Sequence, residues 1–85
     1  MENTSTETKG PVFTDRRGRM RLAIFANETE IGVRYSSAIT RSWKEEGDDE
    51  YHTTHWLDEH DLLNTAKLAH TADDWIAAER RQQHD

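Results

Sequence analysis

Basic side chains that could bind phosphates gather in one part of the sequence. Residues 11–44 carry seven bases against three acids, whereas residues 45–85 carry three bases against twelve acids. Guanidinium groups hold phosphate oxygens through paired hydrogen bonds, and a glycine among them lets backbone N–H groups approach. The densest cluster therefore predicts phosphate contacts or, alternatively, a tight turn whose solvated charges protect a strand from edge pairing. The basic residues are Arg16, Arg17, Arg19, Arg21, Arg34, Arg41 and Lys44, and Gly18 lies inside the cluster.

Aromatic side chains are interleaved with these basic residues. Bases of single-stranded nucleic acids stack on aromatic rings, and each stack contributes about 1–3 kcal/mol. Phe25, Trp43 and Trp56 could provide such platforms. In a domain of this size a tryptophan more often packs in the core or in a dimer interface, and this alternative stays open for both tryptophans.

The five histidines and the acidic runs form no ligand set for a metal. On a strand, His52 and His55 point to opposite faces, and on a helix His60 and His70 lie about three turns apart. Residues 45–50 (EEGDDE) are acidic, but their spacing does not match a calcium-binding loop, so a solvated hairpin tip is the simpler interpretation. We therefore expect neither a bound metal nor a cofactor.

No arrangement of side chains predicts catalysis. Ser36, Ser37 and Ser42 lack the elbow of an activated serine, and the chain has no glycine-rich phosphate loop. A sheet covered by one helix also forms no deep cleft. The sequence therefore predicts a protein that is not an enzyme.

Length and composition limit the chain of 85 residues to one small domain. Residues 1–10 (MENTSTETKG) are polar and lack apolar periodicity, so they are predicted to form a disordered tail. Residues 11–81 are predicted to form a single domain, and residues 82–85 a frayed end. Because 33% of the residues are hydrophobic and 33% are charged, the core is small, and we expect a homodimer that shares apolar surface.

The sequence contains no cysteine and no targeting segment. The lack of cysteine fits a reducing compartment. No apolar run reaches the length of a signal-peptide core or a membrane span. We therefore expect a cytoplasmic protein without membrane contact.

Four segments are predicted to be strands. The middle two alternate between apolar and polar residues with the period that is typical of half-buried strands. The first is a short extended piece after Pro11, and the last is rich in threonine and aromatic residues. In chain order, the four segments are residues 12–17, 19–27, 33–44 and 51–57. From Asp58 onward the period becomes helical, with Asp58 as the N-cap and Asp61 completing a capping box. This order predicts an α+β fold, in which a four-stranded antiparallel meander carries one C-terminal helix on one face (ββββα). The predicted apolar stripe of the helix is Leu62, Ala66, Ala69, Ala72 and Ile76, widened by Leu63, Leu68 and Trp75.

A single helix covers only one face of such a sheet, so the other face is solvated or forms an interface. The alternation predicts a core face of Met20, Leu22, Ile24, Val33, Tyr35 and Ile39. The opposite face is then basic and carries aromatic rings. Its predicted residues are Arg19, Arg21, Phe25, Arg34, Thr40, Ser42, Lys44, His52, Thr54 and Trp56.

About two thirds of the chain resembles a family of small uncharacterised bacterial proteins. The shared pattern is a glycine–aromatic–serine strand with an R-S-aromatic-K segment, followed by a D-L-L…A-K-L-A helix that ends in an aromatic–isoleucine pair. This resemblance implies no activity. The residues that carry it are Gly32, Tyr35, Ser36, Arg41, Ser42, Trp43, Lys44, Asp61, Leu62, Leu63, Ala66, Lys67, Leu68, Ala69, Trp75 and Ile76.

In strand order, terminal helix and a basic strand pair followed by an acidic-glycine turn, the chain is also similar to the single-stranded-DNA-binding domain of the transcriptional positive cofactor four type. That resemblance implies a dimer formed through helices and DNA held by the sheets. The chain departs from those basic domains in its net charge of −6. Phosphate neutralisation normally supplies most of the affinity for nucleic acid, so the departure bears on this function directly.

Two hypotheses from different classes follow. In the first, a small accessory or regulatory protein holds single-stranded nucleic acid on its basic sheet face. In the second, a protein–protein interaction module docks a partner through its acidic helix or a sheet edge and binds no nucleic acid. Under the first hypothesis, the nucleic-acid-binding residues are Arg19, Arg21, Arg34 and Lys44 for phosphates, and Phe25 and Trp56 for bases.

Overall fold

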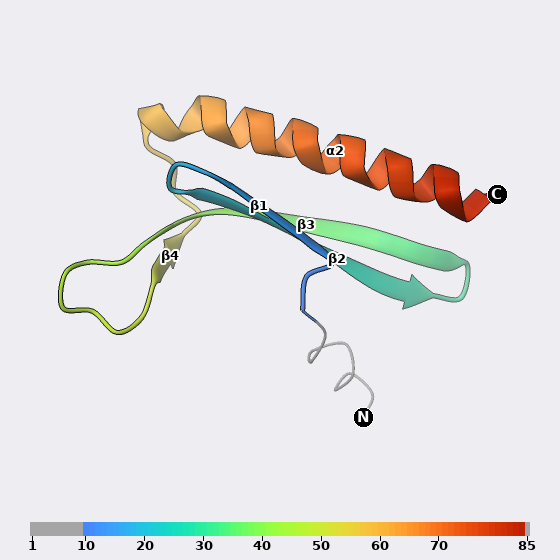
Figure 1. Ribbon diagram of the computed structural model, residues 1–85, viewed down its shortest axis with the longest axis horizontal. Helices are drawn as coiled ribbons and strands as arrows, with labels where there is room; N and C mark the ends of the chain where they lie inside the picture. The colour runs from blue at the N-terminus through green and yellow to red at the C-terminus, as the bar shows by residue number, and fades with distance from the viewer. Residues whose placement is uncertain (1–9, 85) are drawn as a thin grey trace.

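The computed structural model describes residues 10–84, which form a four-stranded antiparallel sheet with one long helix across one face (Figure 1). This confirms the predicted fold class and order of elements. Residues 1–9 of the predicted tail and residue 85 lie outside the described residues, and the helix includes residues 82–84. The strands, in sheet order, are β1 (Phe13–Arg17), β2 (Met20–Thr29), β3 (Gly32–Trp43) and β4 (His52–Thr54); a 3₁₀ turn, η1 (Glu59–Asp61), leads into α2 (Leu62–His84).

Two tight hairpins connect the first three strands, through loops at residues 18–19 and 30–31. Gly18 has a φ of 60°, a conformation that side chains disfavour, and a Cβ there would lie 3.0 Å from Nδ2 of Asn64 in α2. The second turn is shorter than the predicted one, because residues 27–29 of β2 continue to pair with β3. The first loop therefore lies against the helix, and the second ends a long two-stranded ribbon.

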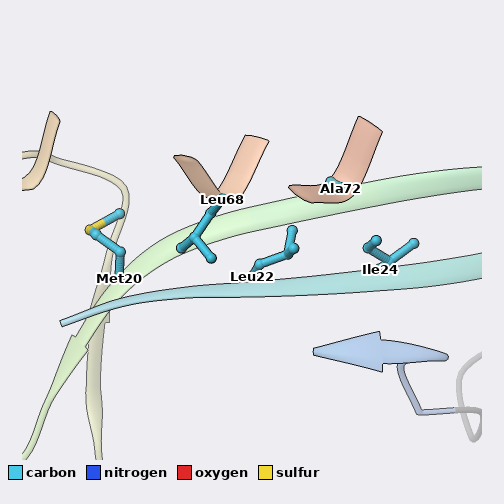
Figure 2. Packing of buried hydrophobic residues seen from close by; sticks show 5 residues of the cluster. All are labelled: Met20, Leu22, Ile24, Leu68 and Ala72. Carbon is cyan, nitrogen blue, oxygen red and sulfur yellow. The ribbon is translucent and has the colours of Figure 1, made fainter. Parts of the chain in front are cut away.

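The core forms where the helix-facing side chains of β2 meet α2. Met20, Leu22 and Ile24 are fully buried and form one cluster with Leu68 and Ala72 (Figure 2). Alternate residues of a strand point to the same face, so this cluster confirms the predicted core face of β2. The half-buried side chains that pack around it are Phe13, Tyr35, Ile39, Trp75 and Ile76.

A buried carboxylate fixes the rotation of the helix about its axis. Asp61 is only 3% exposed, and its oxygens lie 3.7 Å from guanidinium nitrogens of both Arg19 and Arg41. The backbone N–H of Asp58 donates to Oδ2 of Asp61 at 2.9 Å, which confirms the predicted capping box. Since a buried charge is costly without partners, Asp61 must face the sheet, and the side of α2 that follows it in helical register faces the sheet too.

The predicted helix stripe is consequently only partly right. Its members Leu68, Ala72 and Ile76 pack on the sheet. The members of the stripe that lie on other sides of the helix than Asp61 point to solvent instead. These exposed members of the predicted stripe are Leu62, Leu63, Ala66 and Ala69.

The molecule is elongated, and α2 covers only one face of the sheet (Figure 1). Its extents are 46 × 33 × 16 Å and its radius of gyration is 15.1 Å, whereas a compact domain of this length would have about 12 Å. Between residues 10 and 84, no helix is both long enough and apolar enough to cross a membrane. In the described part of the chain, the sheet face away from α2 has no covering layer.

Candidate nucleic-acid interface

The side chains on the sheet face away from α2 form a surface that we call the open face. Leu22 and Ile24 point toward α2, so the residues between and beside them in β2 point away, and residues paired directly across strands share a face. In the four described strands, this face carries three arginines, several hydroxyl groups and no acidic side chain. Its residues are Thr14 and Arg16 of β1; Arg21, Ala23, Phe25, Asn27 and Thr29 of β2; Arg34, Ser36, Ala38, Thr40 and Ser42 of β3; and Thr53 of β4.

Arg16 and Arg21 lie directly opposite each other on β1 and β2. Because the loop between β1 and β2 has two residues, the cross-strand pair that flanks it, Arg17 and Met20, is joined by backbone hydrogen bonds. Arg16 and Arg21 therefore form a pair without ladder hydrogen bonds, the kind in which side chains come closest. Like charges opposite each other destabilise a sheet, and an anion between the two guanidinium groups removes that repulsion. The pair is thus suited to holding a phosphate.

A second group of cations surrounds an exposed ring near β4. Arg16 Nη2 donates to Ser42 Oγ at 3.1 Å, and its guanidinium carbon lies 6.0 Å from the centre of the Tyr51 ring. Lys44 Nζ lies 5.8 Å from the same ring centre. Tyr51 is 63% exposed, so this end of the sheet presents an aromatic ring with two cations over it.

The nucleic-acid-binding residues predicted from the sequence include neither Tyr51 nor Arg16. Pairing across a two-residue hairpin at residues 18–19 would have placed Arg16 opposite Arg21. No comparable signal points to Tyr51, because its approach to Arg16 depends on how the β3–β4 loop returns to the sheet.

Arg34 marks the other end of the open face. It pairs with Asn27, which is six residues along β2 from Arg21, so about 20 Å separates the two arginine positions at about 3.4 Å per residue. Phe25 lies between them, half-buried and opposite Ser36. An extended chain of nucleotides along β2 would meet cations at both ends and an aromatic ring in the middle.

The prediction that Arg19 lies on this face is wrong. Its Nη2 atom lies 3.7 Å from Asp61 and 3.9 Å from Asp58, at the start of the helix. The reason is its position in the turn at residues 18–19, where the strict alternation of strand faces does not apply. Arg19 therefore holds the helix rather than facing the basic surface.

The face predicted for β4 is also wrong. His52 and Thr54 lie opposite Trp43 and Arg41, whose side chains alternate with that of Ser42 and are on the α2 side. β4 has only three residues, and the long loop before it decides its register. Thr53 takes the place on the open face instead.

Neither tryptophan of this region belongs to the open face. Trp56 lies beyond β4 in the connection that leads to η1, and it is 82% exposed. Trp43 stacks on His52 with ring centres 5.4 Å apart, and the Arg41 guanidinium lies 5.2 Å from its ring. Its indole N–H also donates to Glu45 at 3.4 Å. Trp43 is thus engaged by its neighbours and is neither a core residue nor a free platform.

The β3–β4 loop borders the open face with negative charge. It consists of residues 44–51, and all of its residues between Lys44 and Tyr51 except Gly47 are acidic. His52 Nε2 lies 2.7 Å from Asp48 Oδ2 and so helps to hold the loop. A hollow in this loop is lined by Asp48, Asp49, Glu50 and His52. Anions are therefore repelled at this margin and attracted on the strands.

One further cluster, Asp58, Glu59 and His60, places a potential metal-ligand atom of each residue within 4.8 Å of the others. All three side chains are exposed, and Asp58 already lies beside Arg19. Metal sites in proteins normally hold their ligands rigidly through a second shell of hydrogen bonds. We assign no metal or cofactor to this cluster.

By fold and surface, the chain is a small α+β protein with one helix-covered sheet face and one basic sheet face. Comparisons with protein families, with curated proteins and with solved structures give no match for this chain. The resemblances to the bacterial family and to the cofactor-type domain therefore stay predictions, and the function is inferred from the open face.

Proposed function

We propose that this protein is a non-enzymatic binding protein that holds single-stranded nucleic acid, in particular DNA, on its open face. The observation that carries the proposal is the set of three arginines on that face, with no acidic side chain on the described strands beside them. In this role the arginines and Lys44 bind phosphates, while Phe25 and Tyr51 stack bases. The three arginines are Arg16, Arg21 and Arg34.

The shape of the face favours a single strand over a duplex. A duplex is usually read by a helix or a two-stranded ribbon that enters its major groove. The two-stranded end of β2 and β3 carries only Arg34 of the three arginines, whereas Arg16 and Arg21 lie on the broader part of the sheet. A single strand can lay its phosphates along the cations and turn its bases onto aromatic rings. The hydroxyl groups of Thr40, Ser36 and Thr14 add hydrogen-bond partners for phosphate and sugar oxygens.

The net charge of −6 is compatible with this function because the charges are segregated. Many of the acids lie on α2 or in the β3–β4 loop, and a helix with its side chains is about 10 Å thick. The Debye length is about 8 Å at physiological salt, so charges on the far side of the helix are largely screened from the open face. The resemblance to the positive cofactor four type and the absence of cysteine support a DNA-binding role in the cytoplasm.

The experiment that tests the proposal is a fluorescence anisotropy titration of a labelled mixed-sequence single-stranded oligonucleotide. We expect a micromolar or lower Kd at about 50 mM salt. With three or four phosphate contacts, the affinity should fall about 20- to 50-fold at about 200 mM salt. No binding at the lower salt concentration would overturn the proposal.

A double charge reversal locates the binding surface. Arg21→Glu combined with Arg34→Glu should abolish binding, because both ends of the open face then repel phosphates. Lys67→Glu combined with Arg81→Glu makes the same change in net charge on exposed positions of α2 and is the matched control. Equal loss of affinity in the two double variants would mean that only net charge matters and that the open face is not the site.

A second candidate function, docking of a partner protein, is favoured by apolar side chains around the start of α2. Trp56, Leu62 and Leu63 are 82%, 57% and 65% exposed. Exposed apolar groups beside acidic residues are typical of protein interaction surfaces. Under this function the oligonucleotide titration is negative, and Asp73→Lys with Asp74→Lys weakens binding of a basic partner.

We further propose that the protein acts as a homodimer. Five side chains make up the buried hydrophobic core. A core of that size stabilises a free monomer only weakly, and burial of more surface between two copies would add to it. Sedimentation equilibrium over a range of concentrations measures this directly, and a single monomeric mass at all concentrations would refute the homodimer.

A further inference from the structure

The outer side of β3 is a long sheet edge. β4 pairs with β3 only at Arg41, Ser42 and Trp43, so residues 32–40 have β2 on one side and no described strand on the other. We call this stretch the β3 edge. Natural proteins protect such edges with proline, charged side chains or a bulge. The β3 edge has no proline and no bulge, and Arg34 is its one charged residue. It is therefore able to pair with another strand.

The direction of the peptide groups along the β3 edge follows from the hairpins. The backbone N–H of Ser42 donates to the carbonyl oxygen of Arg19 at 2.9 Å, and Gly32 closes the two-residue loop opposite Thr29. The backbone N–H and C=O groups of these residues therefore point toward β2, and the direction of these groups alternates from each residue of β3 to the next. Odd-numbered residues of β3, including Val33, Ser37 and Ile39, consequently direct their N–H and C=O groups to the outer side.

We propose that a second copy of this chain pairs with the β3 edge, strand β3 against strand β3 and antiparallel, with the two-fold axis at Ser36. Ser36 is the midpoint of residues 32–40, so this register uses the whole edge. It places Val33 of each copy opposite Ile39 of the other, and both residues point outward, as a hydrogen-bonded antiparallel pair requires. The inference rests on the homodimer proposed above and assigns its interface.

The side chains along the edge are complementary to themselves in this register. Val33 and Ile39 form an apolar cross-strand pair on the α2 side, and Arg34 lies opposite Ala38 on the open face, so no two like charges meet. Moving the axis to Ser37 would set Val33 against Arg41, which already pairs with β4. Moving it by half a residue would place outward peptide groups opposite inward ones.

The helices leave room for this pairing. The core residues of α2 lie over β2, and three strand spacings of about 4.8 Å would place the β2 strands of the two copies about 14 Å apart. Packed helices need only 8–10 Å between their axes, so the two helices do not collide. Tyr35 keeps its contacts with Trp75 and Arg80 on the α2 side. The paired sheet would also join the two open faces into one basic surface.

Disulfide cross-linking at the axis tests the register. The chain has no cysteine, so Ser36→Cys introduces a single thiol. Residues that face each other in a pair without hydrogen bonds have Cα atoms about 4.5 Å apart, within the range that a disulfide bridges. We expect mild oxidation to convert most of this variant into a covalent dimer. The control is Ala77→Cys on the exposed side of α2, which should remain monomeric on a denaturing gel.

A proline substitution tests the backbone hydrogen bonds. Ser37 is exposed and its N–H points outward, so Ser37→Pro removes one edge donor without removing a bond to β2. We expect loss of the dimer in sedimentation velocity with an unchanged far-UV circular dichroism spectrum. Ser37→Thr keeps the N–H and should keep the dimer.

The outcomes separate this interface from the homodimer itself. A wild-type protein that is monomeric at all concentrations overturns both. A wild-type dimer in which Ser36→Cys cross-links no faster than Ala77→Cys overturns only the β3 edge. If Ser37→Pro fails to fold, amide exchange of the wild-type protein decides: protection of Val33, Ser37 and Ile39 that rises with concentration supports the edge, and protection that does not rise overturns it. Oligonucleotide binding is measured separately, so its failure leaves both results standing.

Discussion

At the scale of single residues, Arg21 is placed where a sheet would be more stable with a neutral side chain. It lies opposite Arg16 in the pair geometry that brings side chains closest, and no described acidic side chain shares their face. Residues that break a local rule of stability are most often found at functional sites. The two arginines therefore provide a test that separates function from folding.

We predict that Arg21→Gln makes the protein more stable and the oligonucleotide complex weaker. Removal of the like-charge pair should raise the free energy of unfolding by about 0.2–1 kcal/mol. Loss of one phosphate contact should reduce the slope of log K against log salt concentration by about 0.7. Urea unfolding and anisotropy titrations measure the two effects. A variant that loses both stability and affinity would show that Arg21 supports the fold instead.

Asp61 is the opposite case, because it serves the fold and not the open face. Its carboxylate meets Arg19 and Arg41 and also accepts the N–H of Asp58. Asp61→Asn keeps a hydrogen-bond acceptor but removes the charge, and it leaves Arg41, whose side chain is 22% exposed, without its ion pair. Because both arginines keep some contact with water, we expect a loss of about 1–3 kcal/mol in urea unfolding. The control, Asp73→Asn at an exposed helix position, should change stability by less than about 0.5 kcal/mol.

At the scale of elements, the rotation of α2 has consequences that mutagenesis can measure. Leu68 is fully buried in the core, whereas Leu63 is 65% exposed. Leu68→Ala should therefore cost about 2–5 kcal/mol, enough to unfold much of so small a protein. Leu63→Ala should cost no more than about 0.5 kcal/mol. Thermal unfolding of both variants checks the rotation, and similar costs would mean that the helix faces the sheet with another side.

These elements also show what the sequence could predict. Long alternating segments predicted β2, β3 and the faces of both strands, because one slip of register would have buried Arg21 or Arg34. The helix rotation could not be predicted from apolar residues, since Leu62, Leu63 and Leu68 occur on different sides of α2. It depends on Asp61, a polar residue whose partners lie far away in the chain.

The open face was predictable to the same extent. Arg21, Phe25 and Arg34 lie in long strands, and the alternation places them together. Arg19 lies in a turn and Trp56 in a connection, where no period determines the direction of a side chain. Tyr51 gains its cations only through the return of the β3–β4 loop.

At the scale of the whole molecule, negative charge is absent from the open face of the described strands and concentrated in the β3–β4 loop and the helical segment. The β3–β4 loop brings this negative charge closest, because its acids lie between Lys44 and Tyr51, and the Tyr51 ring lies beside the open-face cation Arg16. The acidic loop repels anionic ligands, so contacts on the open face must outweigh this repulsion. It disfavours polyanions that extend past the sheet most strongly. A single strand short enough to stay on the sheet avoids the loop.

Neutralising the loop should therefore strengthen binding. We consider a triple variant in which Glu46→Gln, Asp49→Asn and Glu50→Gln are combined, with Asp48 retained because it holds His52. Each acid at about 10 Å from a phosphate costs on the order of 0.4 kcal/mol in water, so removing three should raise affinity by up to about eightfold at low salt. The gain should shrink at about 200 mM salt, where the Debye length falls below that distance.

The matched control removes three acids from the helical side, by Glu59→Gln, Asp73→Asn and Asp74→Asn. It changes the net charge of −6 by the same amount as the loop variant but leaves the margin of the open face as it is. If oligonucleotides bind on the open face, the loop variant gains affinity in anisotropy titrations and the helix variant gains little, because screening acts over the thickness of the molecule. Equal gains would indicate that nucleic acid responds to net charge alone, and a larger gain from the helix variant would place the binding surface on α2.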